Sequence, residues 1–338
     1  MPSDDLRLTA QQMVAPGKGI LAADESTGTM NKRLTAENLD TTEEVRRQYR
    51  QLITSTPDLG NWISCVILYD ETVRQVSDDG TPLRQLAVDN GVMPGIKVDK
   101  GAKALAGSDD EKITEGLDGL RERLDEYREL GMMFTKWRAV LDIGGGHPSF
   151  QAIRANAQAL ARYAALSQEA GLVPMVEPEV LMDGDHTLEQ AEDATTRTLR
   201  EVFSELAIQN VRLEEMVLKP NMVVAGKENP NQPSHEEVAD ATVRALSRTV
   251  PPAVPGIAFL SGGQSDETAT VNLNAINQRG TMPWQLTFSY GRGLLAPTLH
   301  DWAGKPENVQ QAQETLIHRS KLNAAARDGK YDPSLEQR

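Results

Sequence analysis

The chain has 338 residues, of which 39% are hydrophobic and 25% are charged, as is typical of a soluble globular protein. This length suits two ordinary domains or one large α/β barrel. The formal net charge of −14 argues against a partner that is a nucleic acid or an anionic membrane, so any phosphate site needs a local cluster of cations. The single cysteine, Cys65, lies in an apolar run and is expected in the core.

The sequence contains no signal for membrane insertion or secretion. No segment reaches the roughly 18 uncharged apolar residues that a membrane helix needs. The N-terminus, MPSDDLRL, carries acids where a secretory signal has basic residues followed by an apolar stretch. We therefore expect a cytoplasmic protein.

Short apolar runs recur along the whole chain and predict buried strands. In chain order they are residues 17–25, 61–69, 92–99, 133–143, 173–181, 214–224, 256–263 and 284–292.

Amphipathic segments separate most of these runs and predict helices. After a polar lead-in helix they are residues 41–54, 110–131, 149–171, 187–210, 234–250, 266–278 and 306–327. Thr41–Glu44 and Ser234–Glu237 read as capping boxes, in which a hydroxyl and a glutamate three residues apart close the first turn.

Strands that alternate with helices predict a parallel sheet with right-handed crossovers. Eight such units at this length favour a (β/α)8 barrel, that is, a TIM barrel, as a single α/β domain over residues 1–338 with a short C-terminal tail at 328–338. An open doubly wound sheet is the alternative, but no GxGxxG motif follows the first predicted strand.

Polar side chains cluster at the predicted strand ends, where barrel enzymes carry their active sites. Asp24 ends the first strand, and four pairs spaced by two residues lie in later ones, so each pair points to one side of its strand. These pairs are Lys97 with Asp99, Lys136 with Arg138, Glu177 with Glu179, and Lys219 with Asn221. A single pair is commonly a solvated rim or a structural ion pair. Four pairs inside apolar runs favour a shared site.

Lys219 is the least expected of these residues, because it interrupts the apolar run EEMVLKPNMVV. Burying an unpaired ammonium costs several kcal/mol. The lysine could snorkel to solvent, bind anions in a polar cleft, or act as a neutral amine nucleophile that forms a Schiff base with a carbonyl.

Lysines placed close together lower one another's pKa, which favours the nucleophile, and nearby carboxylates could then transfer protons. Lys136 is the neighbour most expected to keep Lys219 neutral. A protonated imine is an electron sink, so this chemistry needs no metal or cofactor. The five histidines form no ligand pair, which argues against a zinc site.

Two glycine-rich turns follow the seventh and eighth predicted strands, where barrels often bind phosphate. The turns are SGGQ, from Ser261, and SYGR, which ends at Arg292. Backbone N–H groups and Arg292 would hold the anion. Arg33 is a candidate for a second phosphate or, equally, an ordinary residue on a helix surface.

At these residues the chain resembles the class I fructose-1,6-bisphosphate aldolases, the metal-free Schiff-base family. The matching segments extend from about residue 5 to about residue 335 and include GILAADEST, GIKVDKG, FTKWRAVL, VEPEVLMDGDH, VLKPNMV, FLSGGQS and LTFSYGR.

The resemblance implies a role for each matching residue. Lys219 corresponds to the Schiff-base lysine, Glu177 to the acid that handles protons during imine formation, and Asp24 to the base that takes the C4 hydroxyl proton. Glu179 lies beside the catalytic lysines, and Lys136 is the positive partner in the site. The residues that correspond to substrate-binding positions are Arg33, Lys97, Arg138, Ser261, Gly262, Ser289, Gly291 and Arg292.

The resemblance also implies reversible cleavage of fructose 1,6-bisphosphate to triose phosphates in glycolysis and gluconeogenesis, by a cytosolic homotetramer without metal or cofactor. The alternatives are another Schiff-base barrel enzyme, such as a transaldolase or sedoheptulose-bisphosphate aldolase, or a non-catalytic scaffold protein on the same fold. The sequence ends KYDPSLEQR, without the terminal tyrosine of well-known eukaryotic members, and Tyr331 matches the start of their tail. Enamine protonation is therefore expected to be slower or to use another group.

Overall fold

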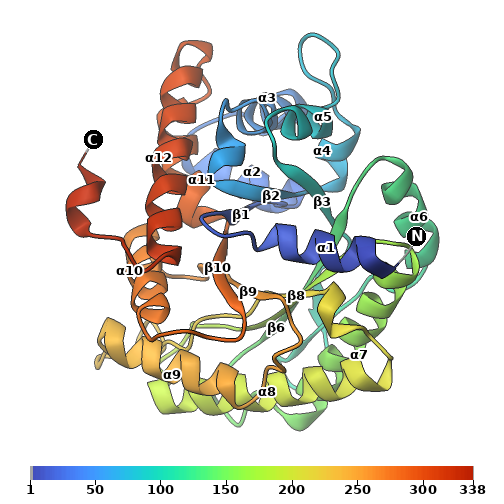
Figure 1. Ribbon diagram of the computed structural model, residues 1–338, viewed down its shortest axis with the longest axis vertical. Coiled ribbons are helices and arrows are strands. Elements are labelled where there is room, and N and C mark those ends of the chain that lie inside the picture. Colours follow the sequence, from blue (N-terminus) through green and yellow to red (C-terminus); the bar gives the residue numbers. More distant parts are fainter. Residues whose placement is uncertain (1–2, 338) are drawn as a thin grey trace.

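The computed structural model describes residues 3–337, and its centre is a closed barrel of eight parallel strands surrounded by helices (Figure 1). The strands run around the barrel in the order β1-β10-β9-β8-β7-β6-β3-β2. Their bounds are β1 Gly19–Ala23, β2 Ile63–Leu68, β3 Met93–Lys97, β6 Phe134–Leu141, β7 Val173–Val180, β8 Val217–Leu218, β9 Gly256–Phe259 and β10 Gln285–Tyr290. The predicted barrel and all eight predicted strand positions are confirmed.

The helices lie outside the strands, and α1 lies across one end of the barrel (Figure 1). Their bounds are α1 Ser3–Met13, α2 Thr27–Ala36, α3 Glu43–Thr54, α4 Asp70–Arg74, α5 Leu83–Asp89, α6 Leu120–Glu129, α7 Phe150–Glu169, α8 Leu188–Ile208, α9 His235–Ser247, α10 Asp266–Asn277, α11 Arg292–Trp302 and α12 Val309–Arg327. Among the described residues, no helix combines the length and the apolar character needed to cross a bilayer.

The interior of the barrel changes from apolar to charged along the strands. Near the α1 end, Ile20, Phe134 and Met175 pack in one buried cluster with residues of that helix. Because strand side chains alternate in direction, the residues further along the same interior-facing rows are charged, namely Lys136 after Phe134 and Glu177 after Met175. This apolar cluster fills the barrel at the α1 end, so the charged side chains lie at the carboxyl ends of the strands.

Two predicted helix features are wrong. Residues 110–131 do not form one helix, because β5 (Lys112–Thr114) pairs antiparallel with β4 (Ala102–Ala104), and α6 begins only after Gly119, which has φ +63°. The helix α3 is capped by Thr42, which accepts a hydrogen bond from the Val45 N–H, so Thr41 and Glu44 form no capping box.

The capping box at Ser234 and Glu237 is confirmed. Beyond α12, residues 333–336 form a short 3-10 helix in which Glu336 contacts both Arg319 and Tyr331 at 2.9 Å.

Candidate active site

A cavity of about 980 Å3 opens at the carboxyl ends of the barrel strands. It is lined by all thirteen residues that the resemblance assigns to the site. The thirteen residues are Asp24, Arg33, Lys97, Lys136, Arg138, Glu177, Glu179, Lys219, Ser261, Gly262, Ser289, Gly291 and Arg292. They come from seven of the eight strands or the turns that follow them, and from α2.

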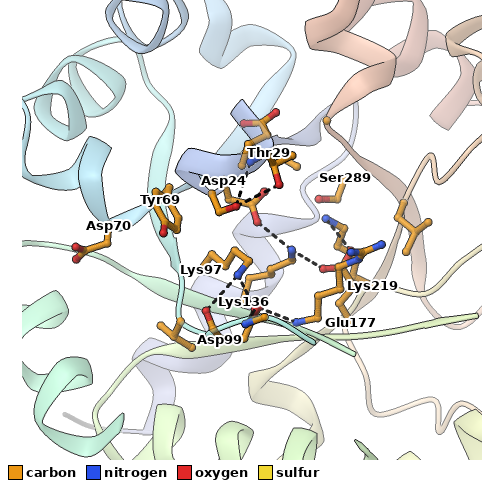
Figure 2. A pocket seen from close by; sticks show the side chains of 18 of the residues that line it. Asp24, Thr29, Tyr69, Asp70, Lys97, Asp99, Lys136, Glu177, Lys219 and Ser289 are labelled. Carbon is orange, nitrogen blue, oxygen red and sulfur yellow. Dashed lines mark hydrogen bonds and ion pairs between the residues drawn. The ribbon is translucent and has the colours of Figure 1, made fainter. Parts of the chain in front are cut away.

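A chain of alternating charges crosses the floor of this cavity, with Lys136 between two carboxylates (Figure 2). Lys136 Nζ lies 2.9 Å from Asp24 Oδ2 and 2.7 Å from Glu177 Oε2. Glu177 Oε1 lies 3.3 Å from Lys219 Nζ. All four side chains are at least nine-tenths buried at the residue level. Each charge therefore has an opposite neighbour in a site of low dielectric constant.

Lys219 differs from an ordinary lysine in its pKa. Burial lowers the pKa of its ammonium most strongly, and the positive charge of Lys136 lowers it further, against the opposing effect of Glu177 and Asp24. Lys136 thus acts on Lys219 in the expected direction, but burial contributes more than Lys136 does. A neutral amine is the nucleophilic form.

The neighbours of Lys219 keep their charges. Burial alone would lower the pKa of Lys136, but Asp24 and Glu177 outweigh it and raise the pKa well above the usual range. Burial alone would raise the pKa of both carboxyls, yet Lys136 and Lys219 lower the pKa of Asp24 and of Glu177. The two lysines of this site therefore have pKa values shifted in opposite directions, that of Lys219 lowered and that of Lys136 raised.

Further ion pairs form the walls beside this floor. Arg138 Nε donates to Glu179 Oε2 at 2.5 Å. Lys97 Nζ donates to Asp99 Oδ1 at 2.5 Å, and the second carboxylate oxygen of Asp99 accepts the Arg138 backbone N–H at 3.2 Å. Asp99 therefore fixes Lys97 relative to β6.

The two glycine-rich turns lie side by side at the cavity wall. Gly262 has a φ of +57°, and its carbonyl accepts a hydrogen bond from the Arg292 guanidinium. Gly291 precedes α11, whose first turn has no side-chain cap, so that helix N-terminus can bind an anion through its backbone N–H groups. The Ser289 hydroxyl is buried without a hydrogen-bond partner among the described residues.

Arg33 lies in the cavity and contacts Glu25. The other carboxylate oxygen of Glu25 lies 2.6 Å from Nη2 of Arg50, a buried residue of α3. Arg33 and Arg292 approach closely enough for their charges to interact, since Arg33 contributes, after burial, to lowering the pKa of Arg292.

The chain as a whole is similar to known proteins. A family model described as fructose-bisphosphate aldolase class-I matches residues 5–338. The chain is 53% identical to a probable fructose-bisphosphate aldolase class 1 of Xanthomonas campestris, over 98% of this chain and 99% of that protein. It is 54% identical to a fructose-bisphosphate aldolase of Schistosoma mansoni, over 98% of this chain and 92% of that protein.

Among solved structures, a fructose-bisphosphate aldolase of Plasmodium falciparum, in complex with TRAP and a small-molecule inhibitor, superposes with a TM-score of 0.97. The two sequences are 49% identical, and the match covers 98% of this chain and 97% of that one. The chain belongs to the class I fructose-bisphosphate aldolases. This family consists of lyases, and its members act on sugar phosphates.

One residue of this aldolase lies elsewhere than its spacing predicts. Asn221 follows Lys219 by two residues but does not line the cavity. Its side chain accepts the Val180 N–H at 3.0 Å and donates to Thr195 Oγ1 of α8 at 3.1 Å. The strand β8 ends at Leu218, and Pro220 has no N–H to continue the ladder, so the alternation of side-chain directions ends there.

Arg50 was not singled out from the sequence pattern. Its only visible signal is the spacing Arg46-Arg50, which places two arginines on one face of α3. The structure buries both of them. Asp99 did carry a signal, as the second member of a predicted pair.

Proposed function

We propose that this aldolase reversibly cleaves fructose 1,6-bisphosphate into dihydroxyacetone phosphate and glyceraldehyde 3-phosphate through a Schiff base on Lys219. The observation that carries the proposal is the pairing of Lys219 with Glu177 at 3.3 Å beside a cationic Lys136. A lysine with a lowered pKa next to an acid can both attack a ketone and receive help in losing water.

The proposed reaction begins when the neutral Lys219 amine attacks the C2 ketone and forms a carbinolamine. Glu177 transfers the protons that allow this adduct to lose water and become an iminium ion. The iminium then accepts the electron pair of the C3–C4 bond as Asp24 takes the C4 hydroxyl proton. Glyceraldehyde 3-phosphate leaves, and protonation and hydrolysis of the enamine release dihydroxyacetone phosphate and the free lysine.

The cations at the cavity wall support a substrate with two phosphates. The turns at Ser261 and Gly291, with Ser289 and Arg292, offer backbone and guanidinium donors for one phosphate. Arg33 and Lys97 lie toward the other end of the substrate in this proposal, and Arg138 and Glu179 complete the wall between them.

Borohydride trapping tests this proposal directly. Incubation with dihydroxyacetone phosphate and sodium borohydride reduces an iminium to a stable secondary amine, and peptide mass analysis locates it. We expect the adduct on Lys219, none in Lys219→Met, and an unchanged adduct in the matched control Lys103→Met, whose lysine is exposed on β4. An adduct on another lysine, or no adduct in the unaltered chain, contradicts the mechanism.

The proposal includes a cytoplasmic homotetramer, which rests on the family resemblance. Size-exclusion chromatography with light scattering measures the oligomer, and a monomer at micromolar concentration contradicts it. If the enzyme turns over sedoheptulose 1,7-bisphosphate in preference to fructose 1,6-bisphosphate, the function is that of the alternative, a sedoheptulose-bisphosphate aldolase.

A further inference from the structure

Arg50 lies outside the cavity, yet it contacts a residue inside it. The side chain of Arg50 is 3% exposed and that of its partner Glu25 is 5% exposed. Glu25 and Arg33 line the cavity, whereas Arg50 does not. Arg50 of α3 thus contacts the site through Glu25, by its carboxylate at 2.6 Å and its backbone carbonyl at 3.5 Å.

Each oxygen of the Glu25 carboxylate accepts a hydrogen bond from a different guanidinium group. Oε1 accepts a hydrogen bond from Arg33 Nη1, and Oε2 accepts one from Arg50 Nη2 at 2.6 Å. The Arg33 side chain is 27% exposed and faces the cavity, while that of Arg50 is covered by protein. One carboxylate and two guanidinium groups leave one positive charge, and only Arg33 can present it to a ligand.

We propose that Arg50 is a positioning residue that neutralises Glu25, so that Arg33 keeps its positive charge for the second phosphate of the substrate. Without Arg50, Glu25 and Arg33 form a neutral pair. An incoming phosphate then competes with Glu25 for Arg33 and gains far less from it, because charge-assisted bonds need a cation that is not already neutralised. The inference deepens the proposed function and rests on it.

The pKa of Glu25 agrees with this role of Arg50. Burial alone would raise the pKa of the Glu25 carboxyl, but Arg50 and then Arg33 outweigh burial and lower it. Glu25 is therefore an anion in the folded protein. Arg50 contributes the larger compensating effect of the two arginines.

The test compares two substrates that differ in one phosphate. We measure KM for fructose 1,6-bisphosphate and for fructose 1-phosphate, which lacks the phosphate assigned to Arg33. In Arg50→Met the KM for the bisphosphate should rise about tenfold, which corresponds to one charge-assisted hydrogen bond. The KM for the monophosphate should stay within about twofold. The ratio of the KM for the bisphosphate to the KM for the monophosphate, called the KM ratio below, therefore measures the effect of Arg50 on binding of the second phosphate.

Arg46→Met is the matched control on the same helix. Arg46 is buried four residues earlier and binds Glu71 through two hydrogen bonds of 2.7 Å, but neither residue lines the cavity. Its loss should lower the melting temperature and leave the KM ratio unchanged. An equal rise of the ratio in Arg46→Met would show a general structural effect and overturn the proposal.

A double variant separates charge from packing. Glu25→Gln with Arg50→Met removes both buried charges but keeps an amide oxygen that can accept from Arg33. The KM ratio should return to near that of the unaltered chain. If Arg50→Met does not fold, the test uses Arg50→Lys and this double variant. Arg50→Lys should keep a KM ratio close to that of the unaltered chain. A raised KM ratio in the double variant overturns the proposal.

Borohydride trapping on Lys219 distinguishes a failure of this inference from a failure of the proposed function. Arg50→Met should still form the borohydride adduct with dihydroxyacetone phosphate, which has only one phosphate. Normal trapping with an unchanged KM ratio refutes the role of Arg50 alone. Absence of trapping in the unaltered chain refutes the Schiff-base function itself.

Discussion

At the scale of single residues, the two lysines on the floor of the cavity have pKa values shifted in opposite directions. Lys219 and Lys136 share Glu177, yet burial and Lys136 lower the pKa of Lys219, while two carboxylates raise the pKa of Lys136 against the effect of its burial. The difference follows from position, because Lys136 lies between two acids and Lys219 touches one. Neighbouring groups of the same type thus acquire different roles.

Removal of Lys136 should therefore change the pH at which Lys219 reacts. In Lys136→Met the pKa of Lys219 should rise, so the pH profile of borohydride trapping shifts to higher pH. Turnover should fall by about 10²- to 10⁴-fold, the usual range for loss of a group that supports proton transfer. Lys136→Arg keeps the charge and should keep the profile near its original position. An unshifted profile in Lys136→Met would show that burial alone sets the pKa of Lys219.

At the scale of elements, the turn after β9 is held from behind by side-chain amides. Gln264 Nε2 donates to the Ser261 carbonyl at 3.2 Å, and Asn272 Nδ2 of α10 donates to Gln264 Oε1 at 2.6 Å. Asn272 Oδ1 in turn lies 2.6 Å from His235 Nδ1 at the start of α9. These contacts restrict a turn whose glycines would otherwise leave it mobile.

Loss of the Asn272 amide should loosen this turn and weaken phosphate binding. In Asn272→Ala we expect KM for the bisphosphate to rise about five- to tenfold with a smaller change in kcat, since about one net hydrogen bond is lost. Asn277→Ala is a matched control on α10, because within residues 3–337 its amide donates only to the Leu273 carbonyl of the same helix. Equal KM values in the two variants would contradict the role of this amide chain.

The elements also show what the sequence could predict. Hydrophobic runs located all eight strands, and their period of two placed Lys136, Arg138, Glu177 and Glu179 at the cavity. The pattern failed at residues 110–131, where only the second half is helical: the first half holds β5 and the loop that leads to α6. Contacts across the fold, such as Arg50 with Glu25, have no periodic signal, because they join elements that the sequence separates.

At the scale of the whole molecule, the buried acids couple stability to pH. Asp24, Glu25 and Glu177 are buried, and in each case lysine or arginine neighbours lower the pKa below its ordinary value of 3.8 or 4.5 despite the opposing effect of burial. A carboxyl with a lowered folded-state pKa contributes stability above its unfolded-state pKa and loses it as the pH falls toward the folded-state pKa. Glu215, whose pKa burial raises, acts in the opposite sense.

We therefore expect the melting temperature to fall steeply as the pH drops below about 4.5, where the unfolded chain begins to bind protons that the folded chain excludes. Calorimetry from pH 7 to pH 3 measures this slope. Glu25→Gln removes one of the acids, so its slope should be shallower even if its melting temperature is lower throughout. Identical slopes would show that these acids do not control acid unfolding.

The ion pair between Asp24 and Lys136 also bears on how the molecule assembles. It joins β1 to β6, which are not neighbours in the barrel, and β1 is held in place by β10 near the end of the chain. The pair therefore forms only when strands distant in the sequence are in place, whereas each helix can form locally. We expect nucleophilic reactivity at Lys219 to return during refolding no earlier than helix content.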